Sequence, residues 1–315
     1  MKKRISIVTS CFNEAENLPE LYERLHKVFA TLPEYDFEII VSDNLSTDGS
    51  RDVLRQIAAK DKKFKVLLNA NNFGHIRSPY NALLHAKGDA AIAMCSDLQD
   101  PPEMLPELIA AWEAGNKVVC AVKPASKENA LIFFIRSCYY KLLARFSETP
   151  QVRNFYGFGL YDRQFLDALK SYHEPYPYFR GLIGEIGFPR TEIAFLQDVR
   201  KHGRTKNNFF TLYDMAMTGF VNHTKLPLRL AVFCGFMLAI LSLLIALGYF
   251  VYKLIYWNTF SLGLAPLVIG LFFFSAIQLI FIGIIGEYLG AVWTQVKNRP
   301  LAIVEEKINF DGDGD

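Results

Sequence analysis

Apolar and polar positions follow two different patterns along the chain. In the first part, short apolar runs alternate with stretches of helical periodicity, which is typical of a mostly parallel sheet covered by helices. We therefore predict one α/β domain over residues 1–224. Its expected strands are the five short apolar runs at residues 5–9, 37–42, 65–69, 90–95 and 117–122.

Two polar residues are predicted to begin helices in this domain. Asn17 is followed three residues later by Glu20, which is the spacing of a capping box at the start of a helix over residues 17–29. Asp100 precedes Pro101, so we expect Asp100 to cap a second helix whose first position is the proline. The residues just before Asp100 would then lie at a strand-to-helix turn.

The end of the chain contains two much longer apolar runs, at about residues 228–252 and 262–289. Each exceeds the ~20 residues that a helix needs to cross a bilayer, so we predict a transmembrane hairpin within residues 225–297 and a C-terminal tail over residues 298–315. The basic residues that flank the pair place both chain ends in the cytoplasm by the positive-inside rule. A buried two-helix core of a soluble protein is the less favoured alternative. The basic residues that flank the two apolar runs are Lys225, Arg229, Lys297 and Arg299.

Composition narrows the function. The formal net charge is +2 and the basic residues are dispersed, so a nucleic-acid partner is not expected. The five cysteines have no paired metal-binding spacing, and we expect free thiols. Residues 131–146 mix apolar and basic side chains. They fit a helix in the headgroup plane and equally an amphipathic helix packed on the domain.

Polar residues follow three of the predicted strands. In open α/β sheets, ligands bind beyond the carboxyl ends of the strands, so residues 9–14, 43–49 and 95–100 are expected to converge in one crevice. If the segment after the fourth strand is extended, Asp97 and Gln99 project oxygen atoms to the same side. Oxygen ligands suit Mg²⁺ or Mn²⁺.

The order and spacing of the motifs carry a family resemblance. The chain resembles the family 2 inverting glycosyltransferases of GT-A fold, in particular the polyprenyl-phosphate glycosyltransferases of the dolichyl-phosphate mannose synthase and GtrB types, over nearly its whole length. The residues that carry the resemblance are Phe12-Asn13-Glu14, the run from Asp43 to Ser50, Asn72-Phe73-Gly74, Gly88-Asp89, Arg180-Gly181, the basic run 200–206 and the run 286–290.

The resemblance implies a role for each matched residue. Asp43 would accept a hydrogen bond from the nucleobase, and Asp97 with Gln99 would bind Mg²⁺ or Mn²⁺ at the diphosphate. Asn13 and Glu14 also fit a plain turn before a helix, Arg180 a headgroup anchor, and residues 200–206 a solvated basic loop. The implied sets are Ser10, Phe12, Asn13, Glu14, Asp43, Asn72 and Asp97 for the nucleotide sugar, Arg180, Arg200 and Lys206 for the acceptor phosphate, and Asp97, Arg200 and Lys206 for catalysis.

Four positions depart from the family pattern, of which the first is Ser10 in place of the usual proline. Cys95 stands where the metal motif usually has its first aspartate, Asn44 replaces the second aspartate after strand two, and Gly157 replaces the aspartate proposed as the catalytic base. A phosphate monoester is largely dianionic at neutral pH, so it can attack without giving up a proton to a base. We therefore expect an active but divergent enzyme.

The expected function is an inverting transfer of one sugar from a nucleotide sugar, with UDP-glucose favoured, to undecaprenyl or another polyprenyl phosphate at the cytoplasmic face of the plasma or inner membrane. The expected partners are both substrates and membrane lipids, and the resemblance suggests a homotetramer. An alternative is a catalytically silent nucleotide-sugar-binding membrane protein that regulates a partner enzyme. Extension of a lipid-linked oligosaccharide is a third possibility.

Overall fold

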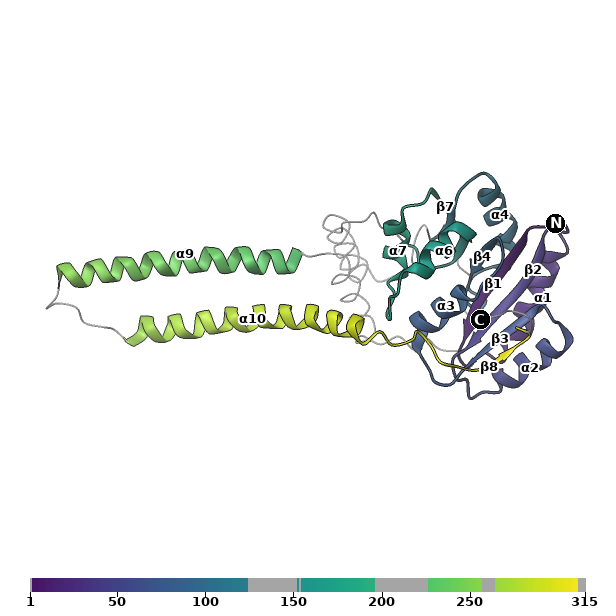
Figure 1. Cartoon of the computed structure of the whole chain (residues 1–315), viewed down its shortest axis with the longest axis horizontal. Helices are drawn as coiled ribbons and strands as arrows, with labels where there is room; N and C mark the ends of the chain where they lie inside the picture. The colour runs from purple at the N-terminus through teal and green to yellow at the C-terminus, as the bar shows by residue number, and fades with distance from the viewer. Residues whose placement is uncertain (1, 124–151, 153, 196–225, 257–263, 311–315) are drawn as a thin grey trace. The chain divides into compact units, whose positions relative to one another are not determined.

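The computed structural model describes residues 2–123, 152, 154–195, 226–256 and 264–310 (Figure 1). The chain divides into two compact units, one formed by Met1–Ala216 with Lys297–Asp315 and the other by Met217–Val296. The first unit therefore ends somewhat before residue 224, and it includes the segment after the second apolar run.

The first unit contains an eight-stranded sheet in the order β7-β5-β6-β4-β1-β2-β3-β8. β1 pairs in parallel with both β2 and β4, so the chain order reverses beside β1. The five predicted strands are present, and β6, β7 and β8 are additional. The strands are β1 (Arg4–Cys11), β2 (Asp36–Asp43), β3 (Phe64–Asn69), β4 (Ala90–Ala93), β5 (Val118–Val122), β6 (Gly159–Asp162), β7 (Arg190–Ala194) and β8 (Val304–Ile308).

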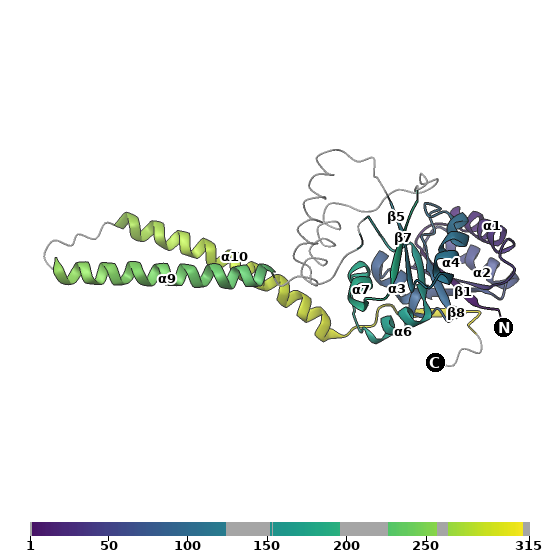
Figure 2. The same ribbon diagram turned by 90° about the horizontal axis from the view of Figure 1, so that it is seen from above.

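Helices cover both faces of this sheet because alternate strand residues point to opposite sides. Ile5 and Ile7 of β1 pack in one cluster with α1, α2 and α4, whereas Val8 packs in the other with α3, α6 and α7. Figure 2 shows α6 and α7 on the opposite side of the strands from α1 and α4. The helices are α1 (Asn17–Phe29), α2 (Ser50–Lys60), α3 (Gly74–Leu84), α4 (Leu105–Glu113), α6 (Arg163–Ser171) and α7 (Phe179–Ile186).

Both predicted helix caps are wrong, although α1 has the predicted bounds. Asn17 is buried, and its side-chain amide donates to the Glu14 carboxylate instead of capping the helix. Asp100 is also buried, and a 3₁₀ turn, η1 (Pro102–Met104), separates it from α4. Local spacing suggested caps, but the buried Asn17 side chain turns back to Glu14 in the preceding loop, and the buried Asp100 carboxylate accepts from the distant Tyr156.

The segment after residue 297, predicted as a tail, instead contributes the edge strand β8. It pairs antiparallel with β3, and the Ala70 amide donates to the Ile303 carbonyl at 2.9 Å (Figure 1). The Asn309 side chain then donates to the carbonyls of Ala58, Asp61 and Phe64. Residues 311–315 lie outside the described residues.

The second unit contains the two apolar helices, α9 (Leu226–Ile255) and α10 (Leu264–Lys297). Both are long and apolar enough to cross a membrane by length and composition, over Leu228–Tyr252 and Gly270–Lys297. None of the window that defines each span is buried inside the structure, which is unlike the core helix of a soluble protein. The predicted second span, residues 262–289, begins and ends somewhat earlier than the candidate span Gly270–Lys297.

Candidate active site

Three loops meet beyond the carboxyl ends of β1, β2 and β4, as the sequence predicted. The Asn44 amide donates to the Cys11 carbonyl at 2.9 Å and joins the β1 loop to the β2 loop. The Ser96 hydroxyl donates to the Ser10 carbonyl, also at 2.9 Å, and joins the β4 loop to the β1 loop. Because chain order reverses between β1 and β4, this is the place where an open α/β sheet forms a ligand crevice.

The β1 loop is fixed to the β2 loop through Asn13, which has a left-handed backbone with φ of 60°. Its amide donates to the Ser46 hydroxyl at 2.9 Å, and its side-chain oxygen accepts from the Thr47 amide at 2.8 Å. Glu14 is buried, and its amide donates to the Ser50 hydroxyl. Asn13 and Glu14 therefore form the expected turn, while Ser10 near the end of β1 and Phe12 in the loop are partly exposed.

Asp43 lies beneath this loop and is completely buried. Its carboxylate pairs with the Arg51 guanidinium at 2.8 Å and accepts from the Ser46 amide at 3.2 Å. The Cys11 thiol donates to its other oxygen at 3.7 Å, and burial together with this carboxylate raises the pKa of the thiol. Asp43 thus supports the loop from inside, and its expected hydrogen bond to a nucleobase stays a prediction.

Asn44 explains one departure from the family pattern. Its side-chain nitrogen donates to Asn72 Oδ1 at 2.7 Å, and its side-chain oxygen accepts from the Phe73 amide at 2.8 Å. An ionised aspartate at this position could accept but not donate, so it would leave the Asn72 contact without its proton. Asn72 is exposed and also accepts from the Gly74 amide.

The β4 loop is a turn and not the extended segment that was expected. Leu98 has a φ of 61°, and the Gln99 amide donates to Asp97 Oδ1 at 3.2 Å. Asp97 and Gln99 are both partly buried. The positions of these two side chains are therefore set by a turn in which the Gln99 backbone amide bonds to the Asp97 side chain, and not by the alternation of side chains along a strand.

Three residues that the sequence did not assign to the site lie beside this turn. Asp100 accepts hydrogen bonds from the Cys95 amide at 2.8 Å and from the Tyr156 hydroxyl. Burial raises the pKa of the Asp100 carboxyl to about 6, and it raises the pKa of Tyr156 as well. The Lys123 ammonium lies 4.1 Å from the centre of the Tyr156 ring.

Lys123 also connects the turn to the predicted acceptor residue Arg180, which lies on α7. Burial lowers the pKa of Lys123; the charges of Asp100 and Asp97 oppose this shift, and that of Arg180 adds to it. The turn and these two cations are thus close enough to interact electrostatically. Lys123 could have been found from the sequence because it is a charged residue directly after a buried strand. Tyr156 could have been found because it precedes Gly157, which departs from the family pattern.

Comparisons with known proteins identify the family. The profile of "Glycosyl transferase family 2" matches residues 6–170. The chain belongs to glycosyl transferase family 2. This family 2 glycosyltransferase has the GT-A fold that its sequence resemblance implied.

Similar proteins match nearly the whole chain. An uncharacterized glycosyltransferase of Synechocystis sp. is 32% identical to this family 2 chain, over 97% of it and 96% of that protein. The SfII prophage-derived bactoprenol glucosyl transferase of Shigella flexneri is 30% identical, over 96% of this chain and 98% of that protein. Among solved structures, a mannosyltransferase of Pyrobaculum calidifontis has 16% identity and a TM-score of 0.46, over 95% of this chain and 87% of that one.

The donor atoms around Asp97 in this glycosyltransferase fit a hard cation only with help from substrate. Asp97 and Gln99 offer a carboxylate and an amide oxygen, whereas both oxygens of Asp100 are taken by Cys95 and Tyr156. Within the described part of the chain, no group of three or more His, Cys, Asp or Glu side chains could hold a metal. The set therefore suits Mg²⁺ or Mn²⁺ coordinated mainly by phosphate and water.

The remaining expectations concern Gly157 and the basic loop. Gly157 has a φ of 119°, a conformation that residues with side chains rarely adopt. The backbone of this family member therefore disfavours the aspartate that the family often has there. Arg200, Lys206 and residues 131–146 lie outside the described residues.

Proposed function

We propose that this glycosyltransferase transfers one hexose, with glucose favoured, from a UDP-sugar to undecaprenyl phosphate or a related polyprenyl phosphate. The observation that carries the proposal is the presence in one chain of the Asp97 crevice and two apolar helices, over a length that matches the bactoprenol glucosyl transferase of Shigella flexneri almost end to end. A lipid phosphate acceptor explains why a nucleotide-sugar enzyme carries such helices.

The reaction is an in-line displacement at the anomeric carbon. An oxygen of the acceptor phosphate forms the new bond as the bond from that carbon to the nucleotide diphosphate breaks, which gives a β-linked product from an α-linked donor. The acceptor phosphate is already largely dianionic at neutral pH, so the step needs no general base. This agrees with glycine at position 157.

The residues of the crevice bind and orient the donor. Ser10, Phe12, Asn13 and Asn72 border the place for the nucleotide, where Asn13 is held rigidly by the β2 loop. Asp97 and Gln99 would hold Mg²⁺ or Mn²⁺, which neutralises charge on the departing diphosphate when it is bound.

Cations direct the acceptor. The charges of Arg180 and Asp97 both influence the pKa of Lys123, in opposite directions, so both residues lie near Lys123. In the proposal, Arg180 holds the acceptor phosphate near the donor diphosphate. Arg200 and Lys206 complete this group in the proposal, as bidentate and point-charge partners of phosphate.

The two apolar helices anchor the enzyme in the membrane that contains the acceptor. We propose that they cross it as a hairpin with both chain ends in the cytoplasm, because the basic residues lie at the outer ends of the pair. The catalytic unit then meets nucleotide sugars on the cytoplasmic face.

The test is a transfer assay with purified full-length protein in liposomes that contain undecaprenyl phosphate. Labelled UDP-glucose, UDP-galactose, UDP-N-acetylglucosamine and GDP-mannose are supplied separately with Mg²⁺ or Mn²⁺, and the lipids are extracted. Label in the lipid fraction from UDP-glucose, with a β linkage by NMR, supports the proposal. Label from another donor alone would overturn the choice of sugar. Nucleotide binding without lipid labelling would favour the silent regulatory protein.

A further inference from the structure

We propose that the edge strand β8 is a working part of the donor site: Glu305 orients Arg51, and Arg51 fixes the two loops that receive the nucleotide. Arg51 and Glu305 are thus positioning residues that act through Asp43. The inference rests on the proposed function, since it takes the Asn13 loop to bind a nucleoside diphosphate.

A continuous series of polar contacts connects the strand to the crevice. Glu305 Oε2 lies 3.1 Å from Arg51 Nη1, and Arg51 Nε lies 2.8 Å from Asp43 Oδ2. The same Asp43 oxygen accepts from the Ser46 amide at 3.2 Å. The Ser46 hydroxyl in turn accepts from the Asn13 amide at 2.9 Å. Four contacts therefore lead from the last strand to the β1 loop.

The burial of Asp43 gives Arg51 its importance. A fully buried carboxylate needs a cation and hydrogen bonds, because it is strongly disfavoured when left uncompensated. Arg51 meets this need while its third nitrogen, Nη2, donates to the Asn69 carbonyl at the end of β3. Each of its three nitrogens thus has a different partner, and Glu305 limits the orientations that the guanidinium can adopt.

A neighbouring ion pair provides a matched control. Glu306 on β8 pairs with Arg55 on α2 at 2.7 Å, one residue further along the strand and one helical turn further along the helix. Arg55 also approaches Asp52 on the same helix, and both of these acids lie outside the crevice. Both pairs join β8 to α2, but only the pair of Arg51 and Glu305 leads to Asp43.

The experiment measures binding of UDP and of GDP, with Mn²⁺, by calorimetry on the full-length protein in detergent, together with donor KM and kcat. Glu305→Gln and Arg51→Gln are compared with Glu306→Gln and Arg55→Gln. We expect Glu305→Gln to weaken nucleotide binding about three- to tenfold and Arg51→Gln to weaken it more than about tenfold. KM should rise with little change in kcat, and both control variants should bind within about twofold of wild type.

Two further variants separate positioning from simple stability. The double variant Arg51→Gln with Glu305→Gln should bind no worse than Arg51→Gln alone, because residues in one series of contacts are not additive. Arg51→Lys should recover only part of the binding, since an ammonium cannot reproduce the three-way contact.

Two results would overturn the inference in different ways. If wild type binds UDP or GDP and Glu305→Gln behaves like Glu306→Gln, the positioning role of Glu305 and Arg51 is wrong and the proposed function stands. If wild type binds neither nucleotide, the proposed function fails and the positioning role of Glu305 and Arg51 fails with it.

Discussion

The hydroxyl of Tyr156 donates a hydrogen bond to the buried carboxylate of Asp100, next to the turn that carries Asp97 and Gln99. Tyr156 precedes Gly157, where the family pattern often has an acid, and the Lys123 ammonium covers its ring. The segment with Tyr156 and Gly157, which departs from the family pattern, thus supports the proposed metal-binding turn through Asp100.

Tyr156→Phe is expected to lower both stability and activity. Loss of the donor leaves a buried acceptor with one partner fewer, which costs about 1–3 kcal/mol of unfolding free energy. A displaced Asp97 turn should lower kcat by about ten- to a hundredfold. Tyr161→Phe is the control, because the Tyr161 hydroxyl donates to the Gly157 carbonyl and not to this turn. Equal kcat losses in both variants, measured in the lipid-transfer assay, would argue against a specific role for Tyr156.

Asp97→Asn is expected to remove most of the activity and to raise the concentration of Mn²⁺ needed for half-maximal donor binding. Asp97 is the one carboxylate in the proposed ligand pair, so neutralising it weakens the attraction for a divalent cation. The measurement is Mn²⁺-dependent UDP binding, alongside transfer before and after chelation. Asp52→Asn, at an exposed surface position on α2, is the matched control. Unchanged metal dependence in Asp97→Asn would contradict the assignment.

Gly157→Asp is expected to destabilise the protein without raising kcat. A side chain at a φ of 119° costs about 1–3 kcal/mol in backbone strain, and an acceptor that is already dianionic gains nothing from a base. Gly115→Asp is the control, since Gly115 has a φ of 101° and open space around it in the turn after α4. A rise in kcat in Gly157→Asp alone, by transfer assay with thermal melts, would show that a base helps.

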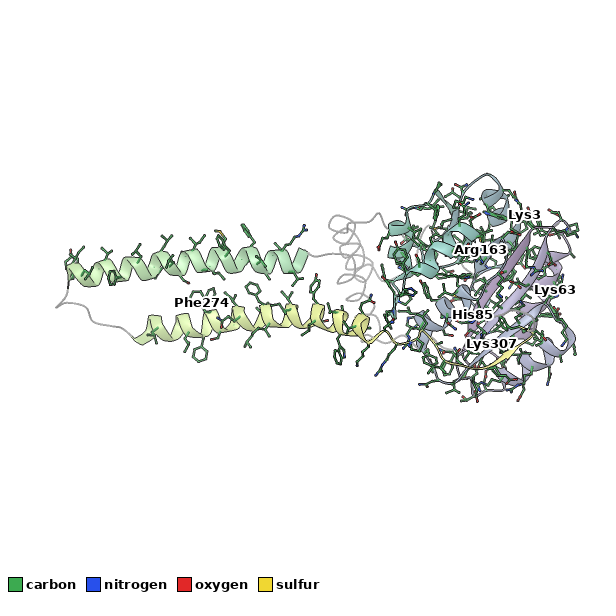
Figure 3. The ribbon with its side chains drawn as sticks, viewed as in Figure 1. Lys3, Lys63, His85, Arg163, Phe274 and Lys307 are labelled. Carbon is green, nitrogen blue, oxygen red and sulfur yellow. The ribbon has the colours of Figure 1, made fainter. Side chains whose placement is uncertain are left out.

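Stability should fall as pH drops through the range in which histidine titrates, and His85 should contribute to the fall. Burial lowers the pKa of His85, the hydrogen bond with the Asn81 carbonyl opposes this shift, and the charges of Lys307, Lys170 and Lys87 add to it. Figure 3 labels His85, at the end of α3, and Lys307, in β8. The unfolded chain then takes up a proton near pH ~6.5 before the folded chain does, so stability is lost until the folded ring also titrates. Denaturant unfolding of His85→Gln should show a smaller loss of stability over this pH range. Identical pH curves for wild type and His85→Gln would contradict this prediction.

The proposed membrane orientation predicts which positions are accessible from outside the cell. Asn258→Cys, between the two apolar runs, should react with a membrane-impermeant maleimide in intact cells. Lys62→Cys in the catalytic unit should react only after the membrane is opened. The unsubstituted chain measures the background from native cysteines. Labelling of Lys62→Cys in intact cells would place the catalytic unit on the other face.

The sequence by itself determined the features that depend on local periodicity. Alternating apolar runs predicted five strands and the helix α1, because the spacing of buried side chains differs between strand and helix. Run length predicted α9 and α10. The rule for parallel sheets then placed the loops of Asn13, Asp43 and Asp97 together, although the strands themselves carry no such information.

Only the tertiary structure decided how polar residues are partnered. Asp100 has the local signature of a helix cap but accepts from Tyr156, more than fifty residues away. Asp43 has the family's position for a base contact but is enclosed by Arg51. The segment with β8 was expected to be a tail but joins β3 across more than two hundred residues. Hydrogen bonds and ion pairs are short-range and non-periodic, so their partners are set by which chain segments the fold brings together.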